Sequence, residues 1–175
     1  AAIASLDAVI CYKLLRYINC ASFSERSEIH SLRQALGLIG SHTLKQWAEL
    51  ILAACNDNLL RTTHDSRPLI RANMCRELAQ LEGEEYSDKA FLVGLLSDLE
   101  TQMETPLEDL LDSLALHPDI AFALLFGEGP LGHLLQQVKH YENEDWSELD
   151  TSHVTQDDYS ASYQAAMQYL GASRG

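Results

Sequence analysis

The stretch AFLVGLLSDLE, residues 90–100, decides the fold class of this chain. Its apolar residues cover most sides of a helix rather than one stripe, which is typical of a helix at the centre of a bundle. The polar pair Ser97-Asp98 follows the apolar run near its C-terminal end. We therefore predict a buried central helix over about residues 87–99, and we take this polar pair as the first candidate site.

Helical periodicity continues on both sides of this stretch, and no segment alternates as a β-strand does. Thr105-Pro106 predicts a helix start, with Thr105 as N-cap and Pro106 in the first turn. The sequence thus predicts an all-α helical bundle with an N-terminal sub-bundle packed on the central helix. We expect one helical domain over residues 1–142, followed over 143–175 by an acidic linker and a C-terminal helix that packs on it. The expected helices span about 3–19, 29–39, 44–54, 68–81, 87–99, 105–114, 118–126, 130–141 and 155–170.

The charge of the chain restricts its partners. Twelve Lys and Arg residues face 26 Asp and Glu residues, so the net charge is −14. Such a surface repels phosphate backbones and anionic lipid, which argues against nucleic-acid and membrane partners. Seven acidic residues and no Lys or Arg lie within residues 142–158. Most basic residues lie in the first 80 positions, so an anionic ligand would have to bind there.

The cysteines indicate a reducing compartment. Cys11, Cys20, Cys55 and Cys75 form no CxxC pair, so neither a zinc knuckle nor a dithiol site is predicted. Cys11 and Cys75 lie in apolar helical patterns, where a free thiol acts as a small hydrophobe. No apolar run is long enough to cross a bilayer, and no secretory signal is recognisable. We expect a cytoplasmic protein, and the start without Met indicates a piece of a longer chain.

Few residues offer metal or acid–base chemistry. His64-Asp65 lies in a polar, turn-like segment, where no helix directs both side chains to a buried metal. His133 and His140 are seven apart on one predicted helix without a third ligand, and we interpret them as surface residues. A serine hydroxyl such as that of Ser97 is a poor metal ligand, and Asp98 alone cannot hold a catalytic ion. We therefore expect no cofactor.

A polar face on the first three helices is the second candidate site. Tyr12, Arg16 and Asn19 recur at helical spacing on the first helix, Arg33 lies on the second and Lys45 on the third. Together they would form a basic groove within an acidic protein. The alternative is that they are ordinary exposed helix faces with packed Arg stems.

An ordered series of segments resembles the HDOD domain, the HD-related output domain of bacterial signalling, in the branch where it follows an EAL domain. The resemblance covers about residues 3–170. Its segments are SLDAVICYKLLRYINCASF, SLRQALGLIGSHTLKQW, RANMCRELAQ, AFLVGLLSDLE, TPLEDLL and GEGPLGHLLQQVKHYENEDW.

This resemblance implies an all-helical relative of the HD phosphohydrolases that acts as a signalling and interaction module. In HD enzymes a His-Asp doublet binds the metal. Here Asp98 matches the Asp, and Ser97 replaces the His. An HD enzyme also offers a His on the fourth helix, which residues 71–73 lack. The branch usually has Pro after the residue at Asp7, where this chain has Ala8.

Sequence and resemblance together predict a non-catalytic regulatory module. Its partner would be an EAL domain, of the same chain or of another signalling protein, associated with cyclic di-GMP turnover. Two alternatives remain open: a divergent HD-type metal-dependent phosphohydrolase that uses Asp98, and a nucleotide-sensing domain. The sequence does not set the oligomeric state.

Overall fold

The computed structural model describes residues 8–20, 28–39, 45, 66–80, 83–152 and 154–173. Within these residues every regular element is helical, which confirms the all-α fold class. Of the helix expected at 44–54, only Lys45 is described, in helical conformation. The elements are α1 (Ala8–Cys20), α2 (Leu32–Ile39), α4 (Arg67–Leu78), α5 (Glu84–Leu96), α6 (Leu99–Met103), α7 (Leu107–Asp112), α8 (Pro118–Phe126), α9 (Gly129–Glu142), the 3₁₀ helix η3 (Trp146–Glu148) and α10 (Gln156–Ser173).

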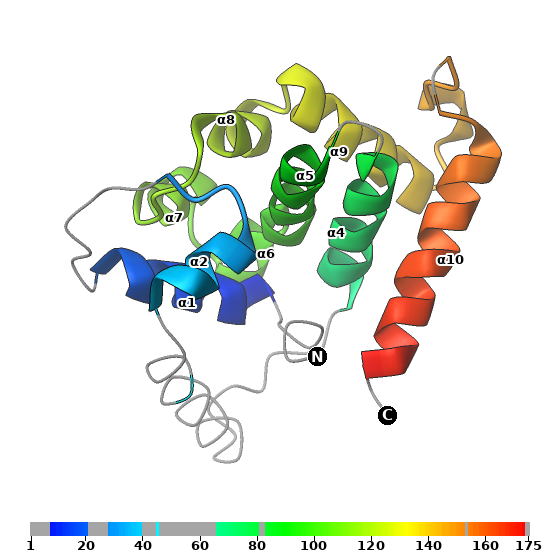
Figure 1. Cartoon of the computed structure of the whole chain (residues 1–175). Coiled ribbons are helices and arrows are strands. Elements are labelled where there is room, and N and C mark those ends of the chain that lie inside the picture. The colour runs from blue at the N-terminus through cyan, green and yellow to red at the C-terminus, as the bar shows by residue number, and fades with distance from the viewer. Residues whose placement is uncertain are drawn as a thin grey trace.

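Helices α4 and α5 lie side by side at the centre, with α10 against the outer side of α4 (Figure 1). Helices α8 and α9 pack on α5. Residues 90–96 are all buried, as the apolar run predicts. The helix begins three residues earlier than expected and ends at Leu96, because Ser97 and Asp98 form a turn into α6.

A glycine sets the spacing of the two central helices. A Cβ atom added at Gly94 would lie 2.7 Å from the Cα of Ala72 and 2.9 Å from the carbonyl oxygen of Arg71. Real Cβ atoms do not approach a backbone this closely, so only glycine permits the contact. The contact brings Arg71, on α4, close to the end of α5.

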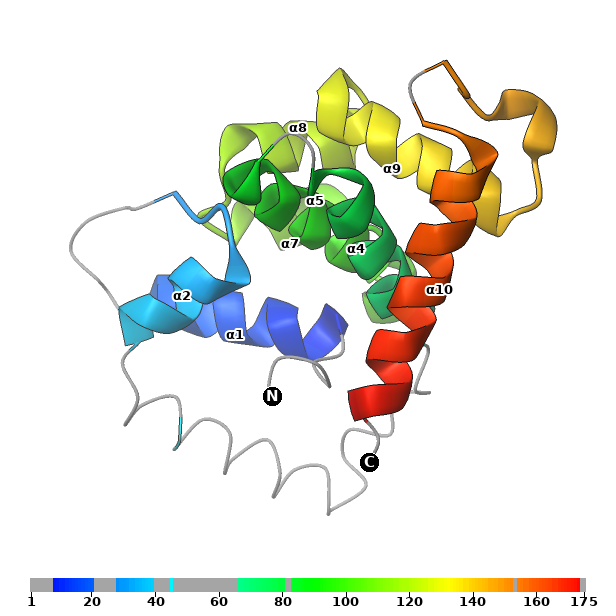
Figure 2. The same cartoon turned by 45° about the vertical axis from the view of Figure 1, so that its right-hand side comes forward.

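The N-terminal helices form their own pair, in which α2 packs on α1 and α1 packs on α5 and α6 (Figure 2). An isolated parallel β-bridge joins Ile29 to Leu116. The amide of Ile29 donates to the carbonyl of Ala115 at 2.7 Å, and the amide of His117 donates to the carbonyl of Ile29 at 2.9 Å. The segment before α2 is therefore tied to the connection between α7 and α8.

The predicted start of α7 is wrong in detail. Pro106 is the N-cap residue rather than a first-turn residue, with extended angles of φ −51° and ψ 134°. The hydroxyl of Thr105 donates to the carbonyl of Met103 at 3.0 Å rather than capping α7. The hydroxyl serves the preceding turn instead, which is the usual competition between Thr side chains and local backbone.

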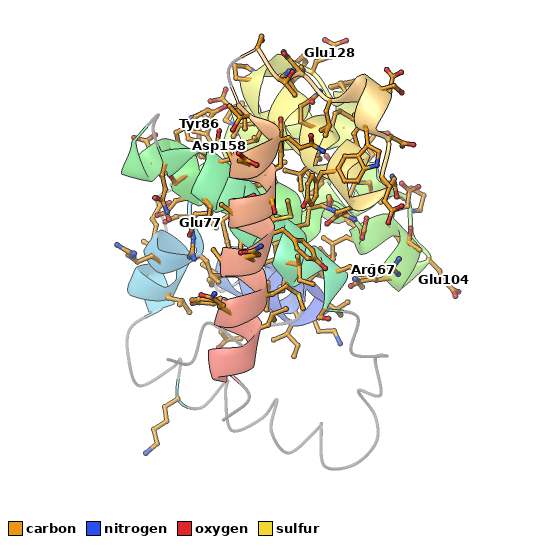
Figure 3. The ribbon with its side chains drawn as sticks, turned by 90° about the vertical axis from the view of Figure 1, so that its right-hand side faces the viewer. Arg67, Glu77, Tyr86, Glu104, Glu128 and Asp158 are labelled. Carbon is orange, nitrogen blue, oxygen red and sulfur yellow. The ribbon has the colours of Figure 1, made fainter. Side chains whose placement is uncertain are left out.

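The C-terminal helix α10 packs on α4 (Figure 3), with Tyr159 and Ala166 each 1% exposed. Its start is capped reciprocally, because the carboxylate of Asp158 accepts from the amide of Thr155 at 2.8 Å. The amide of Asp158 in turn donates to the hydroxyl of Thr155 at 3.3 Å. In the described ranges no helix is long and apolar enough to span a membrane.

Cys11 and Cys75 are both buried thiols rather than half-cystines. Burial raises the pKa of the Cys75 thiol to about 12, so this side chain stays a neutral thiol. The predicted behaviour of these two residues as small hydrophobes is confirmed.

Gly94→Ala should destabilise the protein by about 1–3 kcal/mol, because the new methyl group forces the backbones of α4 and α5 apart. Gly37→Ala is the matched control, since a Cβ there meets no atom within 4 Å. Alanine also favours helix over glycine by about 1 kcal/mol, so the control should be neutral or stabilised. Urea unfolding monitored by circular dichroism measures both. Equal stability of the two variants would contradict the close contact.

Candidate functional site

The Ser97-Asp98 pair contacts a buried arginine. The Arg71 side chain is 9% exposed, and its Nη1 lies 2.7 Å from the Oδ1 of Asp98. The same nitrogen donates to the hydroxyl of Ser97 at 2.8 Å. That hydroxyl in turn donates to the carbonyl of Gly94 at 2.8 Å. Ser97 thus has both a donor and an acceptor within reach, and it orients the guanidinium toward Asp98.

A second carboxylate approaches the same guanidinium from α9. The Nε of Arg71 donates to Oε2 of Glu142 at 2.7 Å, and its Nη2 lies 2.6 Å from the same oxygen. The Glu142 side chain is 16% exposed and that of Asp98 is 28% exposed. One buried cation therefore joins α4, the α5–α6 turn and the end of α9. We call Arg71, Ser97, Asp98 and Glu142 the arginine cluster.

The charges in this cluster depend on one another. Burial acts to lower the pKa of Arg71, but the hydrogen bonds and charges of Glu142 and Asp98 outweigh it and raise that pKa above its ordinary value. Burial raises the pKa of Glu142, and the hydrogen bond from Arg71 offsets only part of this effect. A planar guanidinium suits this arrangement, because it carries five donors in a fixed geometry and stays protonated.

The other titratable candidates lie apart from this cluster. On α9, His133 Nε2 lies 3.7 Å from Asp150 and His140 Nδ1 lies 3.8 Å from Asp145. In the part of the chain that the structure describes, no group of three or more His, Cys, Asp or Glu residues is placed to hold a metal ion. His64-Asp65 lies outside the described residues.

The predicted polar face on the N-terminal helices is only partly exposed. Tyr12 is 3% exposed, and its hydroxyl lies 3.1 Å from that of Ser113, so its assignment to a surface groove is wrong. Asn19 is exposed, but its amide donates to the carbonyl of Ser113 at 2.8 Å. Both residues dock α1 onto the end of α7, because helical spacing alone does not separate an exposed polar face from a packed one. The exposed basic members of the face are Arg16, Arg33 and Lys45.

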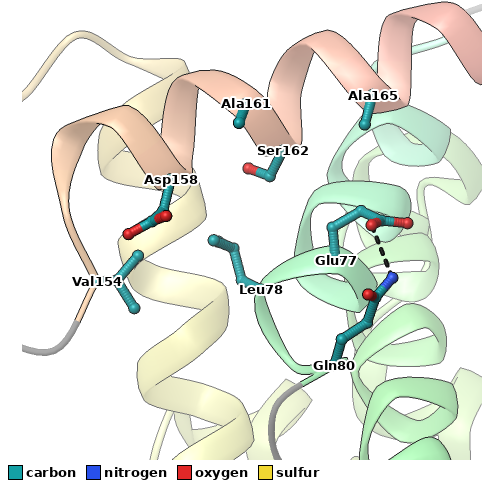
Figure 4. Close-up of a pocket in the computed structure, with 8 residues that line it drawn as sticks. All are labelled: Glu77, Leu78, Gln80, Val154, Asp158, Ala161, Ser162 and Ala165. Carbon is teal, nitrogen blue, oxygen red and sulfur yellow. Dashed lines mark hydrogen bonds between the residues drawn. The ribbon is translucent and has the colours of Figure 1, made fainter.

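A cavity of about 430 Å³ lies between the end of α4 and the start of α10 (Figure 4). Its walls are mostly small or apolar, with Leu78 and Ala161 among them. The carboxylates of Glu77 and Asp158 reach its lining, and none of its described lining residues is basic. Such a lining disfavours the phosphates of a nucleotide.

The sequence did not indicate the role of Glu142, because Glu142 is the first residue of an acidic run that is typical of a solvated surface. A signal was present, since Leu131, Leu135, Val138 and Glu142 follow one another at intervals of four, three and four residues. This spacing places the carboxylate on the buried face of α9. Arg71 has a similar signal, because it lies within a helix whose residues 68–75 are all buried.

Comparisons with known proteins agree with this architecture. The chain is 32% identical over 145 residues to the cyclic di-GMP phosphodiesterase CdgJ of Vibrio cholerae, an alignment that covers 82% of this chain and 34% of that protein. It is 26% identical over 146 residues to the uncharacterized protein YuxH of Bacillus subtilis, with 80% of this chain and 35% of that protein covered. The chain thus spans about a third of the length of these relatives.

No solved structure matches the chain significantly. The sequence profile of the HDOD domain matches residues 1–103, which include α1, α2, α4, α5 and α6. That match contains Arg71, Ser97 and Asp98 of the arginine cluster, whereas Glu142 lies beyond it. The chain therefore belongs to the HDOD domain family.

Proposed function

We propose that this chain is a non-catalytic, protein-binding regulatory module of bacterial cyclic di-GMP signalling. Its partner is an EAL domain, of the same chain or of another cytoplasmic signalling protein. The observation that carries the proposal is the arginine cluster, in which a protein cation bridges the carboxylates of Asp98 and Glu142.

Electrostatics supports a structural role for these carboxylates. A catalytic divalent ion needs several anionic or imidazole ligands with accessible lone pairs. Here the guanidinium of Arg71 occupies lone pairs of both carboxylates, which a metal ion would otherwise use. Its positive charge also repels a metal cation. Unit charges about 4 Å apart interact by about 4 kcal/mol at an effective dielectric constant near 20, so a divalent ion beside Arg71 would meet about twice that repulsion.

The link to cyclic di-GMP rests on a relative. The protein named a cyclic di-GMP phosphodiesterase is similar to this chain over only about a third of its length. We infer that the third of that relative which resembles this chain has a regulatory role. Its phosphodiesterase activity would then belong to a different part of that protein. The exposed basic residues Arg16, Arg33 and Lys45 provide a first contact surface on the N-terminal helices.

The two alternatives make different demands on the site. A divergent phosphohydrolase would need a metal beside Asp98, in competition with Arg71. A nucleotide sensor would need cationic groups in a cavity, whereas a cavity that the described residues form between α4 and α10 carries the carboxylates of Glu77 and Asp158. Both observations favour the interaction module.

Arg71→Met should destabilise the protein by about 3 kcal/mol, because it leaves two poorly solvated carboxylates without a counter-charge. Adding Asp98→Asn and Glu142→Gln should restore part of this loss, since the remaining groups are neutral. Arg76→Met is the control, because Arg76 is half-buried and bridges no pair of buried carboxylates among the described residues. Its guanidinium donates to Asn73 Oδ1 at 2.9 Å and lies over the rings of Phe91 and Tyr169 at 5.5 and 5.4 Å. Its loss should cost less than that of Arg71, about 1–2 kcal/mol. Urea unfolding measures all variants, and an Arg71→Met variant as stable as the wild type would refute the structural role.

The function itself is tested by activity in two settings. The chain alone, dialysed without chelator, should hold sub-stoichiometric metal and hydrolyse no cyclic di-GMP. When it is added to a separately purified EAL phosphodiesterase domain from the same organism, it should change the rate of cyclic di-GMP hydrolysis. Arg16→Ala with Lys45→Ala should weaken this effect, whereas Arg67→Ala, an exposed arginine at the start of α4 (Figure 3), should not. Stoichiometric transition metal together with hydrolysis by the chain alone would overturn the proposal.

A further inference from the structure

Helix α8 carries an apolar stripe on its outer side. Ile120 and Ala123 are at most 1% exposed and face the core. On the other side Phe122 is 45% exposed, Leu125 38% and Phe126 64%. These three residues lie at positions i, i+3 and i+4, so they form one continuous face of the helix. Contiguous exposed apolar side chains, unlike single scattered ones, are typical of interaction surfaces.

The stripe is held in a fixed arrangement. The rings of Phe122 and Phe126 contact each other with centroids 5.1 Å apart. A Cβ added at Gly132 would clash with the backbone of Gly127, so the turn from α8 to α9 is tightly closed. Gly127 adopts a left-handed φ of 68° that ends α8. The stripe is thus preorganised, which lowers the entropy lost when a partner binds.

Charge around the stripe selects its partner. The segment 107–128, which comprises α7 and α8, contains five acidic residues and no Lys or Arg. All five are exposed, and Glu128, just after α8, lies at the edge of the molecule (Figure 3). A second copy of this chain would bring the same acidic residues opposite them, and an anionic membrane would be repelled. The five residues are Glu108, Asp109, Asp112, Asp119 and Glu128.

We propose that α8 is a docking site for an amphipathic helix of a partner protein, one whose apolar stripe is flanked by Lys and Arg. An i, i+3, i+4 stripe is the surface that a second helix packs against. The Lys and Arg side chains of that helix face the carboxylates of α7 and that of Glu128 after α8, since Asp119 already lies 3.4 Å from Lys89 Nζ. This inference rests on the proposed protein-binding function and assigns a surface to it, apart from the basic residues of α1 and α2.

The test uses the full chain and three synthetic helical peptides of equal length. The first carries a leucine stripe flanked by lysines, the second has the same composition in scrambled order, and the third has glutamate in place of each lysine. Fluorescence anisotropy of labelled peptide measures binding. The lysine peptide should bind well above the scrambled peptide, and the glutamate peptide should not bind. Equal binding of the ordered and scrambled peptides would overturn the proposal, because charge alone would then suffice.

Two variants locate the site. Phe126→Ser should weaken binding of the lysine peptide about tenfold or more, as expected for a central aromatic contact. Met167→Ser is the matched control, because Met167 is a 45% exposed apolar residue on α10, and its variant should bind as wild type does. Circular dichroism checks that both variants remain folded. Equal binding by the Phe126 and Met167 variants would refute the α8 site.

The charge requirement has its own variant. Glu108→Gln with Glu128→Gln keeps the stripe but removes two carboxylates, so it should bind more weakly at low salt and show a smaller salt dependence. Asp119 stays unchanged, because Lys89 Nζ already lies 3.4 Å from its carboxylate. Unchanged binding and salt dependence would refute the basic partner. Sedimentation of the wild type alone should give a monomer; a dimer that Phe126→Ser dissociates would assign the stripe to a second copy and overturn the proposal.

Failure of this inference is distinguishable from failure of the function. If the EAL domain responds to the chain, and Phe126→Ser leaves that response and peptide binding intact, the α8 site is wrong while the regulatory role stands. If the EAL domain does not respond at all and the chain itself hydrolyses cyclic di-GMP, the proposed function is wrong whatever the peptides do.

Discussion

The backbone contact between α4 and α5 at Gly94 is the constraint on which the rest of the structure depends. With glycine at this point the two helices approach until no side chain fits between Gly94 and Ala72. The carbonyl of Gly94 then receives the hydroxyl of Ser97, and Ser97 accepts a hydrogen bond from Arg71. The spacing of α4 and α5, the turn at Ser97 and the pairing of Arg71 with its carboxylates thus all depend on the absence of a side chain at Gly94.

Much of the fold could be predicted because apolar periodicity is strong in this chain. The run at residues 90–96 predicts a central helix, and the structure buries every one of its residues. The end of that helix was less predictable, since the side chain of Ser97 stabilises a turn that propensity alone does not indicate. The same competition explains why Thr105 serves the turn before α7 rather than its cap.

The candidate sites were predictable only in part, because a site depends on contacts between helices far apart in sequence. The sequence identified Ser97 and Asp98 but not their partners on α4 and α9. It also placed Tyr12 on a surface, although Tyr12 contacts Ser113, which is 101 positions away. Periodicity states which residues share a face, whereas only the tertiary arrangement states whether another helix covers that face. Glu142 shows the converse, as an acidic residue with the spacing of a buried one.

The charge distribution gives the domain two different surfaces. Arg16 on α1, Arg33 on α2 and Lys45 are exposed basic residues, whereas α7 and α8 carry exposed acidic residues and an apolar stripe. The arginine cluster lies within the helical core and contributes its charges to neither surface.

The bridge between Ile29 and Leu116 bears on the order in which the chain folds. Helices α4 and α5 are neighbours in sequence and can pair soon after synthesis, because little chain entropy is lost in closing a short loop. The segment before α2 is held differently: Gln34 makes local hydrogen bonds to Glu28 and His30, but the carbonyl and amide that hold Ile29 belong to Ala115 and His117. On a ribosome the bridge of Ile29 must wait until that later segment has emerged. We therefore expect α1 and α2 to join the domain late, and to leave it first when the protein begins to open.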